Sequence, residues 1–177
     1  METVVDIIDD KIKNWYALYV KPRHEFKVET ELKILEIENY LPTFIQVKQW
    51  SDRKKKVKEP LFKGYIFIYA NTQERYKALA TESVIKTVSF QGKPSTIPEW
   101  EINNLRKMLE GNPDVYVSDR IKIGTHVKIV EGPMAGVEGV VYRHDTDEMI
   151  AITIELLNRS VSVQLPAGSV TLKIDKK

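Results

Sequence analysis

The hydrophobic pattern of the chain changes after residue 123, and this change limits the folds open to it. Residues 124–177 contain five short runs rich in β-branched side chains, at 127–130, 139–142, 150–155, 161–165 and 170–174. Closely spaced short strands favour a small barrel, because closing a sheet on itself removes its exposed edges. The earlier part of the chain mixes strand and helix patterns. We therefore expect an α+β domain followed by a small all-β one.

The segment before residue 112 predicts a sheet with helices. Strand patterns occupy residues 15–20, 43–50, 64–70 and 84–90, and helix patterns occupy residues 23–38, 72–80 and 98–109. A basic stretch at 54–58 returns from a turn as an exposed hairpin arm. Asn71 and Glu74 have the spacing of a capping box, and Pro98 suits the first residue of a helix. These patterns predict a four-stranded antiparallel sheet with about three helices.

The predicted helices have recognisable apolar faces. The first has a wide one, because apolar residues recur at helical spacing along two adjacent rows: Val28, Leu32, Leu35, Ile34, Ile37 and Leu41. In the second helix the face consists of Tyr76, Leu79 and Ala80. We expect these faces to be buried against the sheet.

Two stretches have no clear hydrophobic period. Residues 111–122 indicate a linker, and the acidic start of the chain indicates a flexible tail. The predicted domains are therefore a tail at 1–13, an α+β domain at 14–111, a linker at 112–122 and an all-β domain at 123–177. The β-branched residues at 150–154 favour a stable all-β fold for the last domain.

Composition narrows the class of protein. The 177 residues are 42% apolar and 29% charged, as in an ordinary globular protein. There is no cysteine, no apolar run of about 20 residues and no signal-like start, so we expect a cytoplasmic protein without disulfides or membrane spans. The net charge is only +2, but residues 48–63 hold seven basic side chains against two acidic ones. A basic patch of this kind is found on nucleic-acid-binding proteins and also on solvated hairpins.

Enzyme motifs are missing from the sequence. His24, His126 and His144 are scattered and have no cysteine partners, so no metal-site spacing exists. The glycine-rich segment 132–136 lacks the Lys-Ser/Thr end of a phosphate-binding loop, and there is no Gly-x-Ser-x-Gly. We predict no catalytic residues, no metal and no cofactor.

Residues 124–139 read Gly-Thr-His-Val-Lys-Ile-Val-Glu-Gly-Pro-Met-Ala-Gly-Val-Glu-Gly. The alternation predicts a strand with Val127 and Ile129 facing inward. A turn at Gly132, Pro133 and Gly136 then leads to a strand that starts at Gly139, and a positive φ is expected at Gly136. The segment resembles the KOW motif of NusG, its relatives and several ribosomal proteins. This resemblance implies an SH3-like barrel.

The first domain resembles the NusG amino-terminal domain. It contains Trp15-Tyr16, a helix after Lys21-Pro22, and the run Glu-Pro-Leu-Phe-Lys-Gly-Tyr-Ile-Phe at residues 59–67. The pattern is most similar to that of the specialised RfaH-like antiterminators. The resemblance implies a transcription elongation and antitermination factor that binds the clamp helices of RNA polymerase and suppresses pausing.

The resemblance also implies two binding surfaces. The predicted clamp-binding residues are Tyr19, Phe62, Tyr65 and Phe67, although aromatic residues at these positions could equally fill a core. The predicted contacts to non-template DNA are Lys21, Arg23, His24 and Lys27, for which the alternative is a solvated helix start. Basic side chains can bind phosphates and exposed bases.

In general NusG proteins, a loop of the KOW domain recruits Rho or a small-subunit ribosomal protein. Leu156, Leu157, Asn158 and Arg159 occupy this loop region but lack the usual Phe-Gly. We therefore expect a monomeric, operon-specific NusG paralogue without an enzymatic activity. The alternatives are a general NusG that couples polymerase to Rho or the ribosome, and a KOW-containing ribosomal or RNA-binding structural protein.

Overall fold

The computed structural model describes residues 11–111 and 113–175 of the chain. These residues form two compact units. Unit 1 contains the described residues up to Leu41 and residues 62–96, and unit 2 contains residues 42–61 and the described residues from Ile97 onward. Most of the predicted tail, residues 1–10, lies outside the described part of the chain. None of the helices in the described part is long and apolar enough to cross a membrane.

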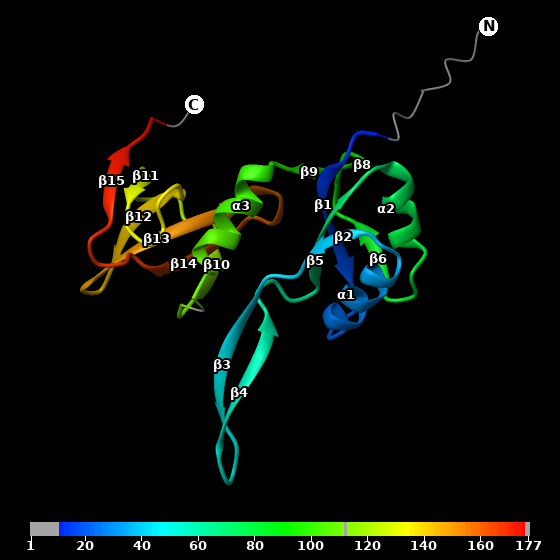
Figure 1. Cartoon of the computed structure of the whole chain (residues 1–177), viewed down its shortest axis with the longest axis horizontal. Coiled ribbons are helices and arrows are strands. Elements are labelled where there is room, and N and C mark those ends of the chain that lie inside the picture. The colour runs from blue at the N-terminus through cyan, green and yellow to red at the C-terminus, as the bar shows by residue number, and fades with distance from the viewer. Residues whose placement is uncertain (1–10, 112, 176–177) are drawn as a thin grey trace, which may run out of the picture. The chain divides into compact units, whose positions relative to one another are not determined.

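Unit 1 is built on an antiparallel sheet (Figure 1). Its path is β2-β5-β1-β6. These strands are β1 (Asn14–Val20), β2 (Glu38–Tyr40), β5 (Tyr65–Ala70) and β6 (Val84–Thr87). A fifth strand, β9 (Thr96–Ile97), begins at the last residue of unit 1 and pairs with β1. The remaining elements of unit 1 are α1 (Glu25–Ile34), α2 (Thr72–Leu79) and the short hairpin of β7 (Ser89–Phe90) and β8 (Lys93–Pro94). The prediction of helices on an antiparallel sheet is confirmed. The predicted number of four strands is wrong, because the sheet has five, and the predicted strand at 43–50 belongs to a separate two-stranded sheet.

The core of unit 1 lies between one face of this sheet and the two helices. Alternate residues of β1 and β5 enter it, because side chains of a strand point to opposite faces in turn. Tyr16, Leu18 and Val20 of β1 pack there with Val28 and Leu32 of α1. α2 contributes Ala78. The second face of the sheet is therefore separate from the helices.

The predicted helix at 23–38 is too long, and its apolar face is narrower than predicted, with Val28 and Leu32 buried. α1 ends at Ile34, which is 76% exposed, and Leu35 is also exposed. Glu36 has a φ of +56°, a left-handed conformation that stops the helix and turns the chain toward β2. Ile37 and Leu41 are buried, but they lie beyond the helix.

Three further predictions for unit 1 have different outcomes. The capping box is confirmed: Asn71 Oδ1 accepts from Glu74 N at 2.8 Å, and Glu74 Oε2 accepts from Asn71 N at 3.0 Å. The predicted face of α2 is confirmed only at Leu79, which packs against the core; Tyr76 is 60% exposed, and Ala78 is the residue fully buried there. The single strand expected at 84–90 is also interrupted, since β6 and β7 are separate at Val88.

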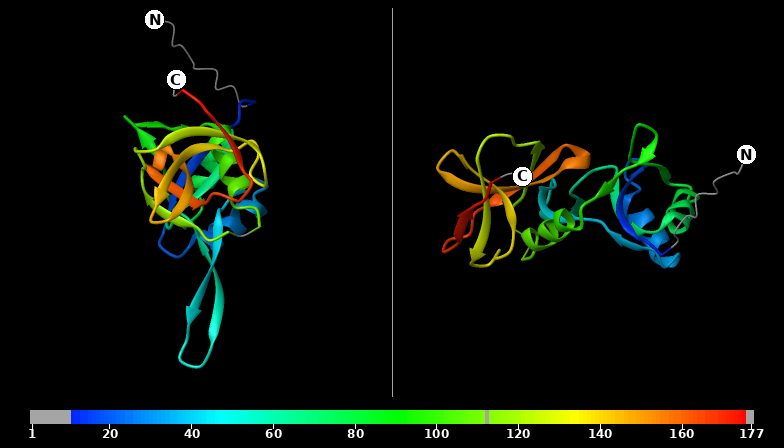
Figure 2. Two further views of the ribbon diagram at one scale, coloured as in Figure 1. Left: turned by 90° about the vertical axis from the view of Figure 1, so that its left-hand side faces the viewer. Right: turned by 90° about the horizontal axis from the view of Figure 1, so that it is seen from above.

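Unit 2 contains a hairpin, one α-helix and a six-stranded antiparallel sheet (Figure 2). The hairpin consists of β3 (Thr43–Gln49) and β4 (Lys54–Pro60), and the helix is α3 (Glu99–Met108). The sheet has the order β10-β14-β13-β12-β11-β15. Its strands are β10 (Tyr116–Asp119), β11 (Thr125–Glu131), β12 (Glu138–His144), β13 (Asp147–Ile154), β14 (Arg159–Gln164) and β15 (Val170–Lys173), with the short helix η1 (Glu155–Leu157) after β13.

All five predicted β-branched runs are strands of this sheet. β10 was not predicted, and it lies in the segment expected to be a linker. α3 packs on the sheet through Ile102, Leu105 and Met108, which are fully buried. Asn104 Nδ2 also donates to the carbonyl of Glu138 at 3.1 Å. The predicted domain boundaries and the closure into an SH3-like barrel stay predictions.

Candidate functional site

The sheet face of unit 1 that points away from the helices carries a row of aromatic side chains. The β1–β5 register pairs Trp15 with Tyr69 and Tyr19 with Tyr65. The Tyr19 and Tyr65 ring centroids are 5.3 Å apart, and the rings are tilted by 50°. Trp15 and Tyr69 are 5.4 Å apart. Cross-strand aromatic pairs of this kind stabilise the sheet and hold each other's rings in place.

The four predicted clamp-binding residues form two pairs that differ in exposure. Phe62 and Phe67 are 4% and 0% exposed, and their rings meet edge to face at 5.9 Å. Tyr19 and Tyr65 are half-buried. Only the two tyrosines therefore offer surface to a partner, whereas Phe62 and Phe67 fill a core in this structure. The assignment of all four to a binding surface stays a prediction.

The turn that enters β5 is held by a buried carboxylate. Glu25 Oε1 accepts from Gly64 N at 2.7 Å, and Val20 N donates to the Gly64 carbonyl at 2.9 Å. Gly64 has a φ of +83°, and a Cβ placed on it would lie 3.2 Å from Tyr19 Cε2. Glycine therefore allows this turn to pass close to the Tyr19 ring. Sequence reasoning missed Glu25, because an acidic residue in the first turn of a helix is normally solvated.

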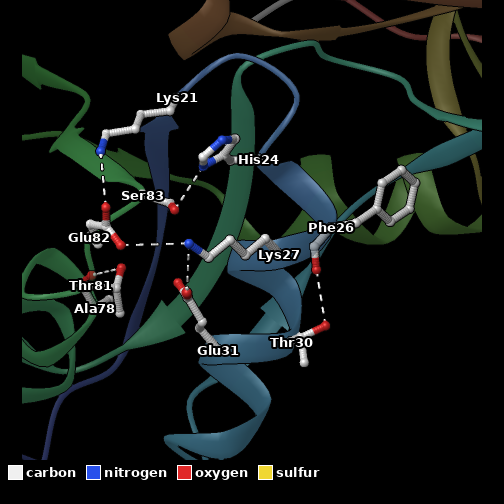
Figure 3. Close-up of polar contacts among 10 residues, drawn as sticks. All are labelled: Lys21, His24, Phe26, Lys27, Thr30, Glu31, Ala78, Thr81, Glu82 and Ser83. Carbon is white, nitrogen blue, oxygen red and sulfur yellow. Dashed lines mark hydrogen bonds and ion pairs between the residues drawn. The ribbon is translucent and has the colours of Figure 1, made fainter.

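Three of the predicted DNA-contacting residues lie together where β1 passes into α1 (Figure 3). Lys21 Nζ and Lys27 Nζ are 4.0 Å and 3.7 Å from the Glu82 carboxylate. His24 Nδ1 is 2.9 Å from Ser83 Oγ. The segment after α2 therefore supplies a negative charge to this cluster, and part of the positive charge is neutralised. Glu82 could not be linked to these lysines from the sequence, because it is far from them along the chain.

Arg23 differs from its three neighbours. It is exposed, and its φ of +63° places it in the left-handed region at the turn before α1. No ion pair involving Arg23 occurs within the described residues. Its guanidinium is therefore the most available cation of the predicted DNA-contacting set. The role of the set stays a prediction.

The predicted KOW turn connects β11 and β12. Gly136 has a φ of +96°, as predicted, and its N–H donates to the Ile129 carbonyl at 2.7 Å. Gly132 and Pro133 lie in the exposed part of the turn, and Gly139 pairs with Val127 in the ladder. Val127 and Ile129 are buried, as expected from the alternation. The residues of the motif therefore form the β11–β12 hairpin of the sheet.

The predicted partner-recruiting loop spans η1 and the start of β14. Leu156 and Leu157 are half-buried, whereas Asn158 and Arg159 are exposed. Asn158 has a left-handed φ of +50°, and Arg159 forms an ion pair with Asp119. This leaves a small, partly apolar surface that ends in an exposed amide.

Unit 2 also contains a buried carboxylate that sequence reasoning missed. Glu101 of α3 is 1% exposed, and its Oε2 accepts from Glu155 N at 3.3 Å. Burial raises the pKa of Glu101 to about 7; the hydrogen bond from Glu155 opposes this shift, and the Glu155 charge adds to it. No group of residues in the described chain has the composition of a metal site.

The NusG family, described as "Transcription termination factor nusG", matches residues 13–106 of the chain. The chain belongs to the NusG family. Proteins of this family act in transcription elongation and termination, so this chain is a transcription factor. This role is consistent with the prediction that the chain has no catalytic residues.

Solved structures of other proteins are also similar. "Domain interaction in Thermotoga maritima NusG" has a TM-score of 0.50 at 24% identity, covers 93% of this chain and 98% of that chain, and shows that the fold is NusG-like. Conformations A and B of the "MjSpt4:Spt5 complex" have TM-scores of 0.32 at 16% and 18% identity, with 92% of this chain and 99% of each of those chains covered.

Proposed function

We propose that this NusG-family chain binds the clamp helices of RNA polymerase through Tyr19 and Tyr65 and suppresses pausing. The observation that carries the proposal is the half-exposed tyrosine pair on the sheet face away from α1 and α2. Aromatic side chains that are partly exposed and already held in place are common anchors of protein interfaces. Phe62 and Phe67 support this pair from the core and do not themselves contact the polymerase.

The proposed mechanism is a shift in populations. A factor that binds the elongating form of polymerase more tightly than the paused form moves the equilibrium by the difference in binding free energy. Each 1.4 kcal/mol of difference changes the ratio of the two forms by about tenfold. Nothing in this mechanism requires a bond to be made or broken.

The cluster at the start of α1 gives the proposed second contact, to non-template DNA. Arg23 is exposed there without an ion pair among the described residues, whereas Lys21 and Lys27 share Glu82. We therefore assign Arg23 the largest part of this contact, with Lys21, His24 and Lys27 around it. Basic side chains at such an edge bind phosphates in a salt-dependent way.

The proposal includes specialisation for particular operons, because the loop Leu156–Arg159 lacks the Phe-Gly pair associated with Rho recruitment. A general factor that couples polymerase to Rho or a small-subunit ribosomal protein is the second candidate, and the family description as a termination factor favours it. Retention of Rho by the immobilised full chain would select the general factor. Copurification with ribosomal subunits, without any polymerase binding, would select the ribosomal alternative.

The test is in vitro transcription with the cognate polymerase. Tyr19→Ala plus Tyr65→Ala should weaken polymerase binding by roughly 30-fold or more, as expected for interface anchors, and should restore pausing. Phe90→Ala is the matched control, because Phe90 is 71% exposed and belongs to the separate β7–β8 hairpin of unit 1. Equal binding by both variants, with circular dichroism showing that both are folded, would disprove the tyrosine assignment.

A further inference from the structure

The β3–β4 hairpin has two faces with different charge. Its register pairs Ile45 with Lys58, Val47 with Lys56 and Gln49 with Lys54. Paired residues of an antiparallel ladder lie on the same face, as do alternate residues of one strand. We call this surface the lysine face; it consists of Ile45, Val47, Gln49, Lys54, Lys56 and Lys58. All six side chains are exposed, and none of them is acidic.

The cations of the opposite face are already engaged. Lys48 forms an ion pair with Glu59, and Lys55 Nζ lies 5.0 Å from the centre of the Trp50 ring. By contrast, within residues 11–111 and 113–175 no ion pair involves the three lysines of the lysine face. The positive charge of this arm is therefore available on one side only.

The three lysines form a regular row. Alternate residues of a strand are about 6.8 Å apart, so the row spans about 14 Å. Duplex DNA carries a negative charge roughly every 1.7 Å along its axis, and its major groove is wide enough for a two-stranded β-ribbon. Figure 1 shows β3 and β4 as a ribbon of this kind. We propose that the lysine face binds the phosphate backbone of duplex DNA without reading its sequence.

The composition of the arm favours duplex DNA over other partners. Proteins that bind single strands stack successive bases on several aromatic rings. Here Trp50 is the one aromatic side chain between residues 45 and 59, and Lys55 already lies over it. Protein interfaces are depleted in lysine and enriched in aromatic residues and arginine. An exposed row of lysines beside two aliphatic side chains therefore fits the phosphate backbone of a duplex better than it fits a single strand or a protein partner.

The test measures binding of the full chain to a labelled random-sequence DNA duplex by fluorescence anisotropy over a range of salt concentrations, without polymerase. The variant is Lys54→Gln/Lys56→Gln/Lys58→Gln. Its control, with the same change in net charge, is Lys93→Gln/Lys122→Gln/Lys173→Gln, three exposed lysines outside the arm. Absence of polymerase makes the outcome independent of the proposed clamp contact.

We expect the hairpin variant to bind roughly 100-fold more weakly at 0.1 M salt and to lower the slope of log K against log salt by about 2.7, as for three lost phosphate contacts. The control should keep most of the affinity. Lys54→Arg/Lys56→Arg/Lys58→Arg should retain binding, which separates loss of charge from loss of fold. Equal weakening of the hairpin variant and the control would overturn the proposal. So would a loss of affinity in the hairpin variant that is as large for single-stranded RNA or DNA as for the duplex.

Discussion

The first turns of α1 and α3 contain buried glutamates that do a similar structural task in different surroundings. Neither helix has a side-chain hydrogen bond from its N-cap residue, which is His24 for α1 and Pro98 for α3. In each case a glutamate of the first turn accepts a backbone N–H from a turn far along the chain. Glu25 binds the N–H of Gly64, and Glu101 binds the N–H of Glu155.

The two contacts differ in geometry and in neighbouring charge. The Glu25 contact is 2.7 Å long, whereas that of Glu101 is 3.3 Å long. The charge of the Glu155 side chain acts on Glu101, although Arg120 Nη1 lies 2.8 Å from Glu155 Oε2. The comparison teaches that a buried carboxylate can tie a helix to a distant turn, and that its neighbours decide whether its charge stabilises the unit.

The largest expected effect is the pH dependence introduced by Glu101. The pKa of Glu101 is about 7 in the folded state, compared with 4.5 for an unperturbed glutamate. Between these two pH values the folded state holds a proton that the unfolded state has released. This stabilisation is complete below about pH 4.5 and is lost as pH rises to about 7, by about 3 kcal/mol at most. Glu101→Gln should remove this fall and be more stable than the original chain at pH 8.

Chemical denaturation of the full chain at several pH values measures this effect as a change in the free energy of unfolding of unit 2. Glu99→Gln is the control, because Glu99 lies exposed in the same helical turn. A pH profile of Glu101→Gln that parallels that of the unchanged chain would contradict the role given to Glu101.

Replacing Glu25 should lower stability, whereas replacing Glu101 should raise it at pH 8. Glu25→Ala leaves the Gly64 N–H without its partner, which should destabilise unit 1 by roughly 2 kcal/mol. Hydrogen exchange at the Gly64 amide should become faster, and denaturation should report the loss of stability. Glu29→Ala on the same helix removes only a pair with Lys33 and should cost about 0.4 kcal/mol. Similar losses in Glu25→Ala and Glu29→Ala would show that the contact of Glu25 with Gly64 has no special weight, and would contradict the comparison of Glu25 with Glu101.

α2 provides a helix start of the ordinary kind. Asn71→Ala removes the N-cap acceptor of the capping box, which should destabilise unit 1 by about 1 kcal/mol. The expected loss is smaller than that for Glu25→Ala, because the N-cap hydrogen bond is only partly buried, whereas the Glu25 hydrogen bond is buried and accepted by a carboxylate. Thermal unfolding of both variants ranks them. A larger loss for Asn71→Ala would show that the distant contact of Glu25 is the weaker of the two.

The smallest expected change in stability is that of an exposed glutamate. Glu82→Gln removes the shared partner of Lys21 and Lys27 and should alter the free energy of unfolding by less than about 0.5 kcal/mol. Lys27 keeps its ion pair with Glu31, but both lysines lose the Glu82 carboxylate and should bind single-stranded DNA a few-fold more tightly at low salt, as measured by anisotropy. Glu131→Gln is the control, because it removes the same charge at another exposed position. It should bind single-stranded DNA more weakly than Glu82→Gln does.

Local patterns in the sequence were sufficient to predict much of this molecule. The capping box at Asn71 and Glu74, the inward-facing Val127 and Ile129, and the positive φ at Gly136 all depend on residues a few positions apart. Spacing of this kind determines hydrogen bonds and faces within one element, so it can be recognised without knowing the rest of the chain.

Packing between distant segments settled what local patterns could not. Phe62 and Phe67 are buried while Tyr19 and Tyr65 keep exposed surface, although all four looked equivalent. Lys21 and Lys27 meet Glu82, and Glu25 meets Gly64, across long separations in sequence. Burial and charge pairing depend on which segments pack together, and a one-dimensional pattern contains no distances between segments.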